Sequence, residues 1–328
     1  MKKILIIQTA SIGDVILATP VAEKLHHHFP SATIDLLVKK GNESLFAGHP
    51  FIGQLLVWDK INSKYRNLLR LLRVIQNQDY DVIVNLQRFA SSGFLTVFGR
   101  AAHTTGFRKN PFSMFFSRRF PHTVDGIHEV DRNLSLISGL VPDGPAPVRL
   151  YPQADSWALV SQYKTRVYIT VAPASLWATK QFPADRWIGF LRQVNHLFII
   201  LVGGKADVGL CRAIVDGVGE ARVLNLAGKL SLLDTAALMR DAQMNFVNDS
   251  APLHLASSVN APVTAVYCST VPAFGFGPRS DNAAIVESDA SLPCRPCGLH
   301  GFTTCPEKHF KCAYTIDIQK LLNRLNHE

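Results

Sequence analysis

The stretch "KKILIIQTASIGDVILATP" (residues 2–20) decides the fold, because a continuous apolar run leads directly into a small polar turn. The run "ILIIQ" (4–8) is typical of a parallel strand that is covered on both faces. A helix is expected from about Val15 to Phe29, ending before Pro30. Asp14 lies where the strand hands over to the helix, and phosphate sites are commonly built there. A carboxylate disfavours phosphate, so Asp14 either caps the helix or takes part in chemistry.

The same alternation of strand-like and helical segments continues along the chain. Further strands are expected at 33–38, 54–59, 80–86, 103–107, 167–173, 197–204, 222–228, 244–249 and 262–268. Further helices are expected near 64–77, 89–99, 183–195, 206–217, 231–241, 250–259 and 315–326. Such a series predicts parallel sheets joined by right-handed crossovers, which is an α/β architecture.

The segment "GLVPDGPAPVRLYP" (139–152) is rich in proline and glycine and is the best candidate for a linker. We therefore expect two doubly wound, Rossmann-like domains, at 1–150 and 151–314, facing each other across a cleft. The C-terminal helix, 315–328, is expected to pack back on the N-terminal domain. A chain of 328 residues is long for one hydrophobic core, which favours the same division.

The composition narrows the class of partner. Hydrophobic residues make up 47% of the chain and charged residues 18%, which is typical of a globular protein. The formal charge of +9 indicates an anionic partner, such as a phosphorylated small molecule or an acidic membrane surface. No nucleic-acid-binding module is visible, and no apolar run of about 18 residues could span a membrane. We expect a cytoplasmic protein that touches a membrane only from outside.

Two stretches of the second half have the pattern of a nucleotide site. In "LVGGKAD" (201–207) a glycine pair that includes Gly203 ends a strand, and Asp207 could accept a ribose hydroxyl or serve as a helix N-terminal charge. In "NDSAPLHLASS" (248–258), Asp249 and Ser250 lie between a strand and a helix, where amide donors can bind a diphosphate. An ordinary N-cap explains the same pair equally well. His254 lies on the same helical face as Ser250, either towards the ligand or in the core.

A third stretch, "APASLWATKQFPADRW" (172–187), combines a strand end with Ser175 and with Lys180 in a loop. A lysine directed into a site can neutralise a departing phosphate. A solvated loop lysine is the alternative.

The basic cluster "GFRKNPFSMFFSRRF" (106–120) interleaves Arg108, Lys109, Arg118 and Arg119 with five phenylalanines. It predicts a surface for an anionic, amphiphilic acceptor at a membrane face. A phenylalanine-rich core segment with solvated charges is the alternative.

Four of the six cysteines crowd the last fifth of the chain: Cys294, Cys297, Cys305 and Cys312. A structural zinc site, an iron–sulfur cluster, reduced thiols and a disulfide pair are all compatible with their spacing. Free or structural cysteine is the leading interpretation, and no catalytic metal is assigned.

Several of these motifs occur together in a known order. The segments "SIGDVILATP", "HEVDRNLSLI" (128–137), "SLWATKQFP" and "FVNDSAPLHLASS" resemble glycosyltransferase family 9, the heptosyltransferases of lipopolysaccharide core assembly. The likeness covers essentially the whole chain. The tail "CRPCGLHGFTTCPEKHFKC" (294–312) looks closer to the branch that adds the second heptose.

The resemblance implies a GT-B fold, with the acceptor on the N-terminal domain and the nucleotide-sugar on the C-terminal one. It implies inverting transfer of heptose from ADP-heptose to a lipopolysaccharide inner-core precursor, without a metal, at the cytoplasmic face of the inner membrane. Carried over by position, Asp14 is the general base and Lys180 contacts the donor phosphates and sugar. The remaining donor-site positions are Ser175, Gly203, Asp207, Asp249, Ser250, Ala251 and His254. The acceptor-site positions are Ser11, Gly13, Arg108, Arg118 and Arg119.

One position departs from the family pattern. Ala251 and Pro252 stand where the family usually continues with glycine after the serine, so a methyl group faces the phosphate seat. Another nucleotide-sugar donor, or a non-catalytic nucleotide-sugar-binding protein, is therefore an alternative. A nicotinamide-dependent oxidoreductase fits the alternating pattern, but the chain lacks the GxGxxG fingerprint.

Overall fold

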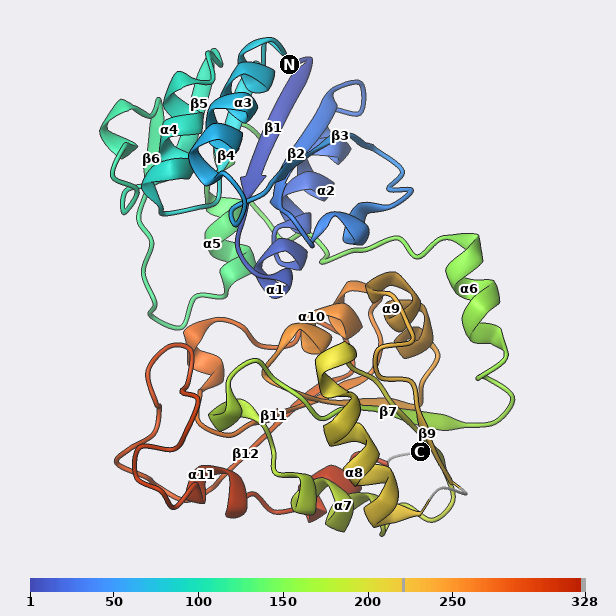
Figure 1. Ribbon diagram of the computed structural model, residues 1–328. Helices are drawn as coiled ribbons and strands as arrows, with labels where there is room; N and C mark the ends of the chain where they lie inside the picture. Colours follow the sequence, from blue (N-terminus) through green and yellow to red (C-terminus); the bar gives the residue numbers. More distant parts are fainter. Residues whose placement is uncertain (220–221, 326–328) are drawn as a thin grey trace. The chain divides into compact units, whose positions relative to one another are not determined.

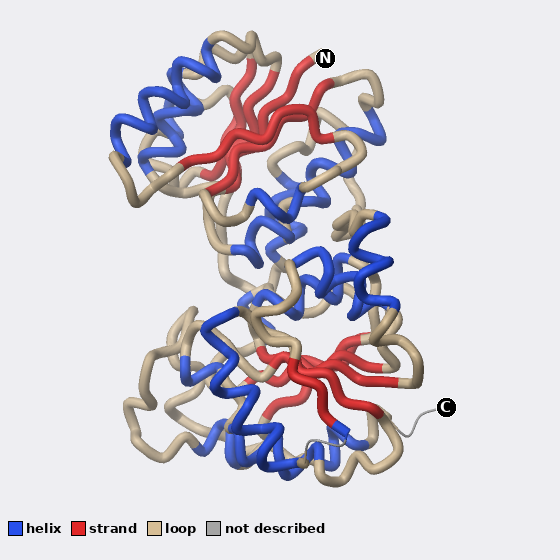
Figure 2. The backbone as a smooth tube through the Cα atoms, turned by 45° about the vertical axis from the view of Figure 1, so that its right-hand side comes forward, coloured by secondary structure: helices blue, strands red, loops and turns tan. Residues whose placement is uncertain are grey.

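The computed structural model describes residues 1–219 and 222–325 and divides the chain into two compact units, Met1–Tyr151 and Pro152–Glu328. The boundary falls inside the proline- and glycine-rich segment. In each unit, helices and loops surround a single parallel sheet (Figures 1 and 2). None of the helices in the described part of the chain is long and apolar enough to cross a membrane.

The first unit is built on six parallel strands in the order β3-β2-β1-β4-β5-β6. These are β1 (Lys3–Gln8), β2 (Thr33–Lys39), β3 (Ile52–Trp58), β4 (Val82–Asn85), β5 (His103–Phe107) and β6 (Arg118–Phe120). The helices are α1 (Ile12–Ile16), α2 (Thr19–His28), α3 (Lys64–Gln76), α4 (Ala90–Phe98) and α5 (Glu129–Ser135), with 3₁₀ turns η1 (Glu43–Phe46) and η2 (Ser113–Phe115). Helix α3 packs beside α4, and α2 packs beside α5.

The second unit repeats this topology. Read from its other edge, its sheet has the order β9-β8-β7-β10-β11-β12, which matches that of the first unit strand for strand. The strands are β7 (Tyr168–Ala172), β8 (Phe198–Leu201), β9 (Val223–Asn225), β10 (Met244–Asn248), β11 (Val263–Tyr267) and β12 (Ala283–Glu287). The helices are α6 (Ala154–Ser161), α7 (Ala184–Leu191), α8 (Val208–Val218), α9 (Leu232–Arg240), α10 (Ala251–Ser258), α11 (Lys311–Tyr314) and α12 (Gln319–Leu322). Short 3₁₀ turns are η3 (Ala178–Lys180), η4 (Lys205–Asp207) and η6 (Pro272–Phe274).

The single helix expected from Val15 to Phe29 is two helices, α1 and α2. Pro20 has no amide hydrogen to donate to the carbonyl of Ile16, and its ring crowds that carbonyl. The hydroxyl of Thr19 donates to the Ile16 carbonyl instead, at 2.8 Å. The chain therefore breaks at the proline and restarts, which leaves Asp14 on a separate short helix.

The C-terminal segment packs into the core of the second unit. The expectation that it packs back on the N-terminal domain is therefore wrong. Ile316, Leu321 and Leu325 are buried in the same hydrophobic cluster as Trp187 and Phe190. The guanidinium of Arg186 donates to the carbonyl of Ile316 at 2.6 Å. Helix α7 of the same unit covers the apolar face of this segment, and the expected helix 315–326 is observed only as the short α12. Residues 326–328 of the expected helix lie outside the described residues.

Candidate active site

Each sheet has one place where a ligand site is expected. The strand order reverses between β1 and β4 in the first unit and between β7 and β10 in the second. Parallel α/β sheets bind ligands at the carboxyl ends of the strands on either side of such a reversal. Asp14 follows β1, Lys180 follows β7, and Asp249 follows β10. The structure therefore brings these three predicted residues to the two switch points.

Asp14 caps α1 and still has a free carboxylate oxygen. Its Oδ2 atom accepts the backbone N–H of Ser11 at 3.1 Å and the Ser11 hydroxyl. Its Oδ1 atom accepts no hydrogen bond from any residue that the structure describes. The side chain is half-buried. Capping and chemistry are thus compatible at this position, because the two roles use different oxygens.

Buried amide side chains lie beside Asp14 at the same switch point, and the sequence analysis missed them. The amide of Gln87 donates to Oε1 of Gln8, at the end of β1, and its backbone N–H donates to Oδ1 of Asn85, at the end of β4. Asn85 Nδ2 and Gln87 Oε1 are buried without a hydrogen-bond partner among the described residues. Unpaired buried polar groups are costly and uncommon. The available signal was an amide residue at the end of each strand.

A buried charged group on α5 lies near Asp14. Glu129 Oε2 contacts the Arg132 guanidinium at 2.8 Å and His122 Nε2 at 3.9 Å. Burial raises the pKa of the Glu129 carboxyl, Arg132 opposes this shift, and the negative charge of Asp14 adds to it. Burial, reinforced by Arg88 and other cations, lowers the pKa of His122 to about 4. The "HEVDRNLSLI" motif therefore places a buried carboxylate, Glu129, which is paired with Arg132 and bordered by the neutral His122, within electrostatic reach of Asp14.

In the second unit, Lys180 and Asp249 form an ion pair. Lys180 Nζ lies 2.6 Å from Asp249 Oδ2, and the two side chains are only 15% and 9% exposed. The hydroxyl of Thr270, which follows β11, donates to the same carboxylate oxygen at 2.6 Å. The solvated-lysine alternative is therefore wrong, because the ammonium is held against a buried carboxylate at the switch point.

The neighbours of Asp249 hold this strand end rigidly. Asn248 accepts the backbone N–H of Phe182 at 2.9 Å and donates to the carbonyl of Pro173 at 2.7 Å. Ser250 is the N-cap residue of α10, but its hydroxyl donates to the Ala174 carbonyl at 3.4 Å and makes no capping bond. The simple side-chain N-cap explanation for Ser250 is therefore wrong, although the Ser250 carbonyl accepts the N–H of Leu253 in the first turn of α10 at 3.0 Å. His254 is buried within α10.

The remaining donor-side predictions have local partners. Asp207 Oδ2 accepts the backbone N–H of Gly204 at 2.7 Å, so this carboxylate closes the glycine turn as a helix N-terminal charge does. A Cβ atom on Gly203 would lie 2.9 Å from the Asp207 side chain, which explains the need for glycine there. Ser175 is half-buried, and its carbonyl accepts the side-chain amide of Gln181 at 2.6 Å.

The position of Lys180 is also set from the cysteine-rich tail. Thr179 is buried, and its hydroxyl accepts the N–H of Phe302 at 2.8 Å. The N–H of Thr179 donates in return to the Phe302 carbonyl at 3.1 Å. Gly301 has a φ of +76°, and a Cβ atom there would lie 2.8 Å from the Thr179 hydroxyl and 3.1 Å from Lys180 Cγ. The loop around Gly301 therefore clamps the turn that carries Lys180.

The cysteines themselves are free thiols, including Cys294, Cys297, Cys305 and Cys312. Across residues 1–219 and 222–325, no group of three or more His, Cys, Asp or Glu side chains is arranged to hold a metal ion. Cys294 Sγ lies 4.0 Å from His309 Nε2, and the Cys297 thiol donates to the Cys294 carbonyl.

The basic cluster at 106–120 is only partly a surface. Phe107 and Phe116 are buried, because they belong to the end of β5 and to the turn packed under it, so these two rings fit the core alternative and not an acceptor surface. Phe115 is exposed, as are Arg108, Arg118 and Arg119. Arg118 Nη1 donates to the carbonyl of Ser138 at 3.1 Å. Arg108 and Arg119 remain candidates for contact with an anionic acceptor.

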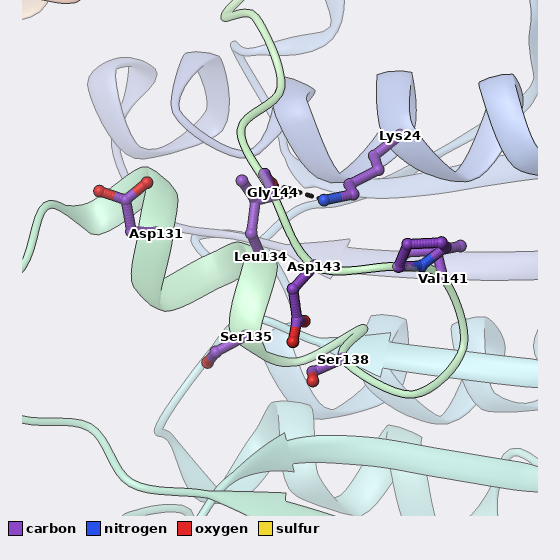
Figure 3. Close-up of a pocket in the computed structure, with 9 residues that line it drawn as sticks. Lys24, Asp131, Leu134, Ser135, Ser138, Val141, Asp143 and Gly144 are labelled. Carbon is purple, nitrogen blue, oxygen red and sulfur yellow. Dashed lines mark hydrogen bonds between the residues drawn. The ribbon is translucent and has the colours of Figure 1, made fainter.

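A separate pocket of about 320 Å³ lies in the first unit between α2, α5 and the segment 138–144 (Figure 3). Lys24 donates to the carbonyl of Gly144 at its rim. None of the predicted site residues lines it. It is distinct from the switch point that carries Asp14.

Two doubly wound units in one chain, each with polar residues at its switch point, are the architecture of the GT-B fold. The family model for glycosyltransferase family 9 (heptosyltransferase) matches residues 68–301, and the chain belongs to this family. It is 27% identical over 290 residues to lipopolysaccharide heptosyltransferase 3 of Escherichia coli, covering 82% of this chain and 84% of that protein.

Solved structures agree with this fold. E. coli ADP-heptose LPS heptosyltransferase II has a TM-score of 0.82 at 20% identity, covering 99% of this chain and 98% of that one. A family 9 glycosyl transferase from Veillonella parvula DSM 2008 has a TM-score of 0.85 at 22% identity, covering 99% and 96%. The predicted GT-B fold and glycosyltransferase class are confirmed.

Proposed function

We propose that the protein transfers a heptose, with inversion, from ADP-heptose to a lipopolysaccharide inner-core acceptor at the cytoplasmic face of the inner membrane. The observation that carries the proposal is the buried Lys180–Asp249 pair at the β7/β10 switch point, next to an α10 N-terminus that the Ser250 side chain does not cap. A cation beside a helix N-terminus suits a leaving diphosphate. Relatives whose names include ADP-heptose support the choice of donor.

In this mechanism the first unit supplies the base. Asp14 Oδ1, which the capping bonds leave free, takes the proton from the acceptor hydroxyl as the hydroxyl oxygen attacks the anomeric carbon. Arg108 and Arg119 would contact anionic groups of the acceptor.

The second unit supplies the charge that the leaving group needs. As the bond from the anomeric carbon to the diphosphate oxygen breaks, negative charge grows on the diphosphate. Lys180 and the Ala251 N–H at the start of α10 stabilise that charge. Asp249 holds the Lys180 ammonium in position before the donor binds, which reduces the reorganisation needed at the moment of reaction.

The departure at Ala251–Pro252 limits the amide donors at this seat. Pro252 lies in the first turn of α10 and contributes no N–H. A family 9 enzyme with a different nucleotide-sugar is the second candidate, and this departure is the observation that favours it. Calorimetry with ADP, UDP and GDP separates the two, since preference for UDP or GDP would contradict the ADP-heptose assignment.

The test of the mechanism is ADP release from ADP-heptose with a core acceptor. Asp14→Asn should lower kcat by at least about 10³-fold and leave ADP affinity within about twofold, because an amide can still cap α1 but cannot act as the base. Asp234→Asn is the matched control, because Asp234 Oδ2 accepts the N–H of Ser231 in the same capping arrangement on α9. Near-normal turnover by Asp14→Asn would refute the role of Asp14.

A further inference from the structure

Helix α3 has two sides of opposite character. Leu68, Leu71 and Ile75 are buried in the core of the first unit. At about 100° per residue, Tyr65, Arg66, Leu69, Arg70 and Arg73 fall on the opposite side of the helix. All five of these side chains are exposed. We call this set the α3 face.

Every charged side chain between Asp59 and Asp79 is basic. Residues 60–78 contain five basic side chains and no aspartate or glutamate. In the described part of the chain, Arg66, Arg70 and Arg73 make no salt bridge or side-chain hydrogen bond, whereas Lys40, Lys164 and Lys320 each pair with an aspartate. Three unpaired guanidinium groups on one helix repel one another, so an anionic partner would relieve that repulsion. The partner should therefore be anionic.

The same arginines border a hollow that suits small anionic groups. Its volume is about 640 Å³, and it is lined by Asn62, Ser63, Arg66, Asn67, Leu69, Arg70 and Arg73. Guanidinium groups bind phosphate through two parallel N–H donors, and the amide and hydroxyl side chains add further donors.

Apolar side chains project from the same face. Ile61, just before α3, is 91% exposed, and Tyr65 and Leu69 are 74% and 51% exposed. Water-exposed apolar groups beside unpaired arginines are typical of segments that lie in the headgroup layer of a bilayer. A soluble phosphate compound would satisfy the arginines and leave these side chains hydrated. An anionic bilayer satisfies both groups.

The face is tied to the predicted acceptor turn. Lys60, one residue before Ile61, donates from Nζ to the Thr9 carbonyl at 2.6 Å and contacts the Thr9 hydroxyl at 3.0 Å. Thr9 directly follows β1 and precedes the turn that carries Asp14. A surface docked through α3 would therefore lie close, along a short chain of contacts, to the residue proposed as the base.

We propose that the α3 face docks the protein on a bilayer that contains anionic phospholipids. The proposal deepens the proposed function by naming the surface that meets the membrane, and its test uses neither donor nor acceptor. A failed transferase assay therefore leaves the vesicle result intact, and the reverse also holds.

The experiment is co-sedimentation of the full chain with phosphatidylglycerol/phosphatidylethanolamine vesicles and with phosphatidylcholine vesicles. The wild type should bind the anionic vesicles and release at high salt. The triple variant Arg66→Gln/Arg70→Gln/Arg73→Gln should bind about 100-fold more weakly. Tyr65→Ser/Leu69→Ser should weaken binding about tenfold while keeping its salt dependence.

The matched control is Arg192→Gln/Arg212→Gln/Lys308→Gln, which removes the same charge from exposed positions of the second unit. This variant should bind vesicles within about threefold of the wild type. Thermal midpoints and ADP calorimetry on every variant show that the fold is kept. Equal loss in both triple variants, equal binding to both vesicle types, or binding to a soluble polyanion but not to vesicles would overturn the proposal.

Discussion

The Lys180–Asp249 pair allows a stabilising role to be separated from a catalytic one. Lys180→Met removes the ammonium and leaves the Asp249 carboxylate, 9% exposed, with the Thr270 hydroxyl as its remaining side-chain partner. Removing one member of a buried ion pair costs about 3–5 kcal/mol, since the other charge stays desolvated and unpaired. Lys180 retains 15% exposure, so the lower end, about 3 kcal/mol, is expected.

The double variant Lys180→Met/Asp249→Asn removes the unpaired charge as well. It should regain most of the lost stability, because two neutral side chains in place of a buried ion pair are often close to neutral in free energy. For a unit of this size, about 3 kcal/mol corresponds to a fall of roughly 6–12 °C in Tm for the single variant. The double variant should lie within a few degrees of the wild type.

The ranking of the wild type and the two variants by kcat should differ from their ranking by stability. Both variants lack the cation that stabilises the leaving diphosphate, so kcat for ADP release should fall by about 10²–10³-fold in both. Urea unfolding and steady-state kinetics on the three proteins give the comparison. A single variant as stable as the wild type would refute the structural role of the pair. Normal turnover in the double variant would refute the role of Lys180 in transfer.

Three further predictions follow from local geometry. Gly301→Ala should lower the free energy of unfolding by about 1–3 kcal/mol and reduce kcat, because the new Cβ atom would meet Thr179 and Lys180 at a φ of +76°. Gly298→Ala, at a φ of +64° with no atom within 4 Å, is the control. Equal losses of kcat in the two variants would contradict the role of Gly301 in positioning Lys180. Burial, with His26 as a second cause, lowers the pKa of His49 to about 4. As the pH falls from 6.5 to 4, His49 takes up a proton in the unfolded chain before it does so in the folded one. The free energy of unfolding therefore falls over this range, by at most about 3 kcal/mol. His49→Asn should flatten this slope in urea unfolding at several pH values, and an unchanged slope would contradict the assignment. Thr270→Val should raise KM for the donor and lower the free energy of unfolding by about 1–3 kcal/mol, because the hydrogen bond to Asp249 is lost. Thr235→Val, at the exposed start of α9, is the control. A larger loss of stability in the control would contradict the role of the Thr270 hydrogen bond.

Much of the fold was readable from local patterns. Continuous apolar runs predicted the central strands, because strands buried on both faces need apolar side chains at successive positions. The edge strands β6 and β12 were missed, since half-exposed edges carry charged or mixed residues such as those of Arg118–Phe120. The separation of α1 from α2 was readable at Pro20, although one continuous helix was expected from Val15 to Phe29.

The site divides in the same way. Strand ends in the sequence drew attention to Asp14, Lys180 and Asp249, because the carboxyl ends of parallel strands meet at one edge, but their roles came from the resemblance to glycosyltransferase family 9. Only the tertiary structure decided that Lys180 pairs with Asp249. It also decided the hydrogen bond between Phe302 and Thr179, 123 positions apart, which holds the turn that carries Lys180. Only the tertiary structure, likewise, buried Phe107 while leaving the arginines of α3 exposed and unpaired. Local periodicity follows from backbone geometry, whereas pairing and exposure depend on which distant segments the packed chain brings together.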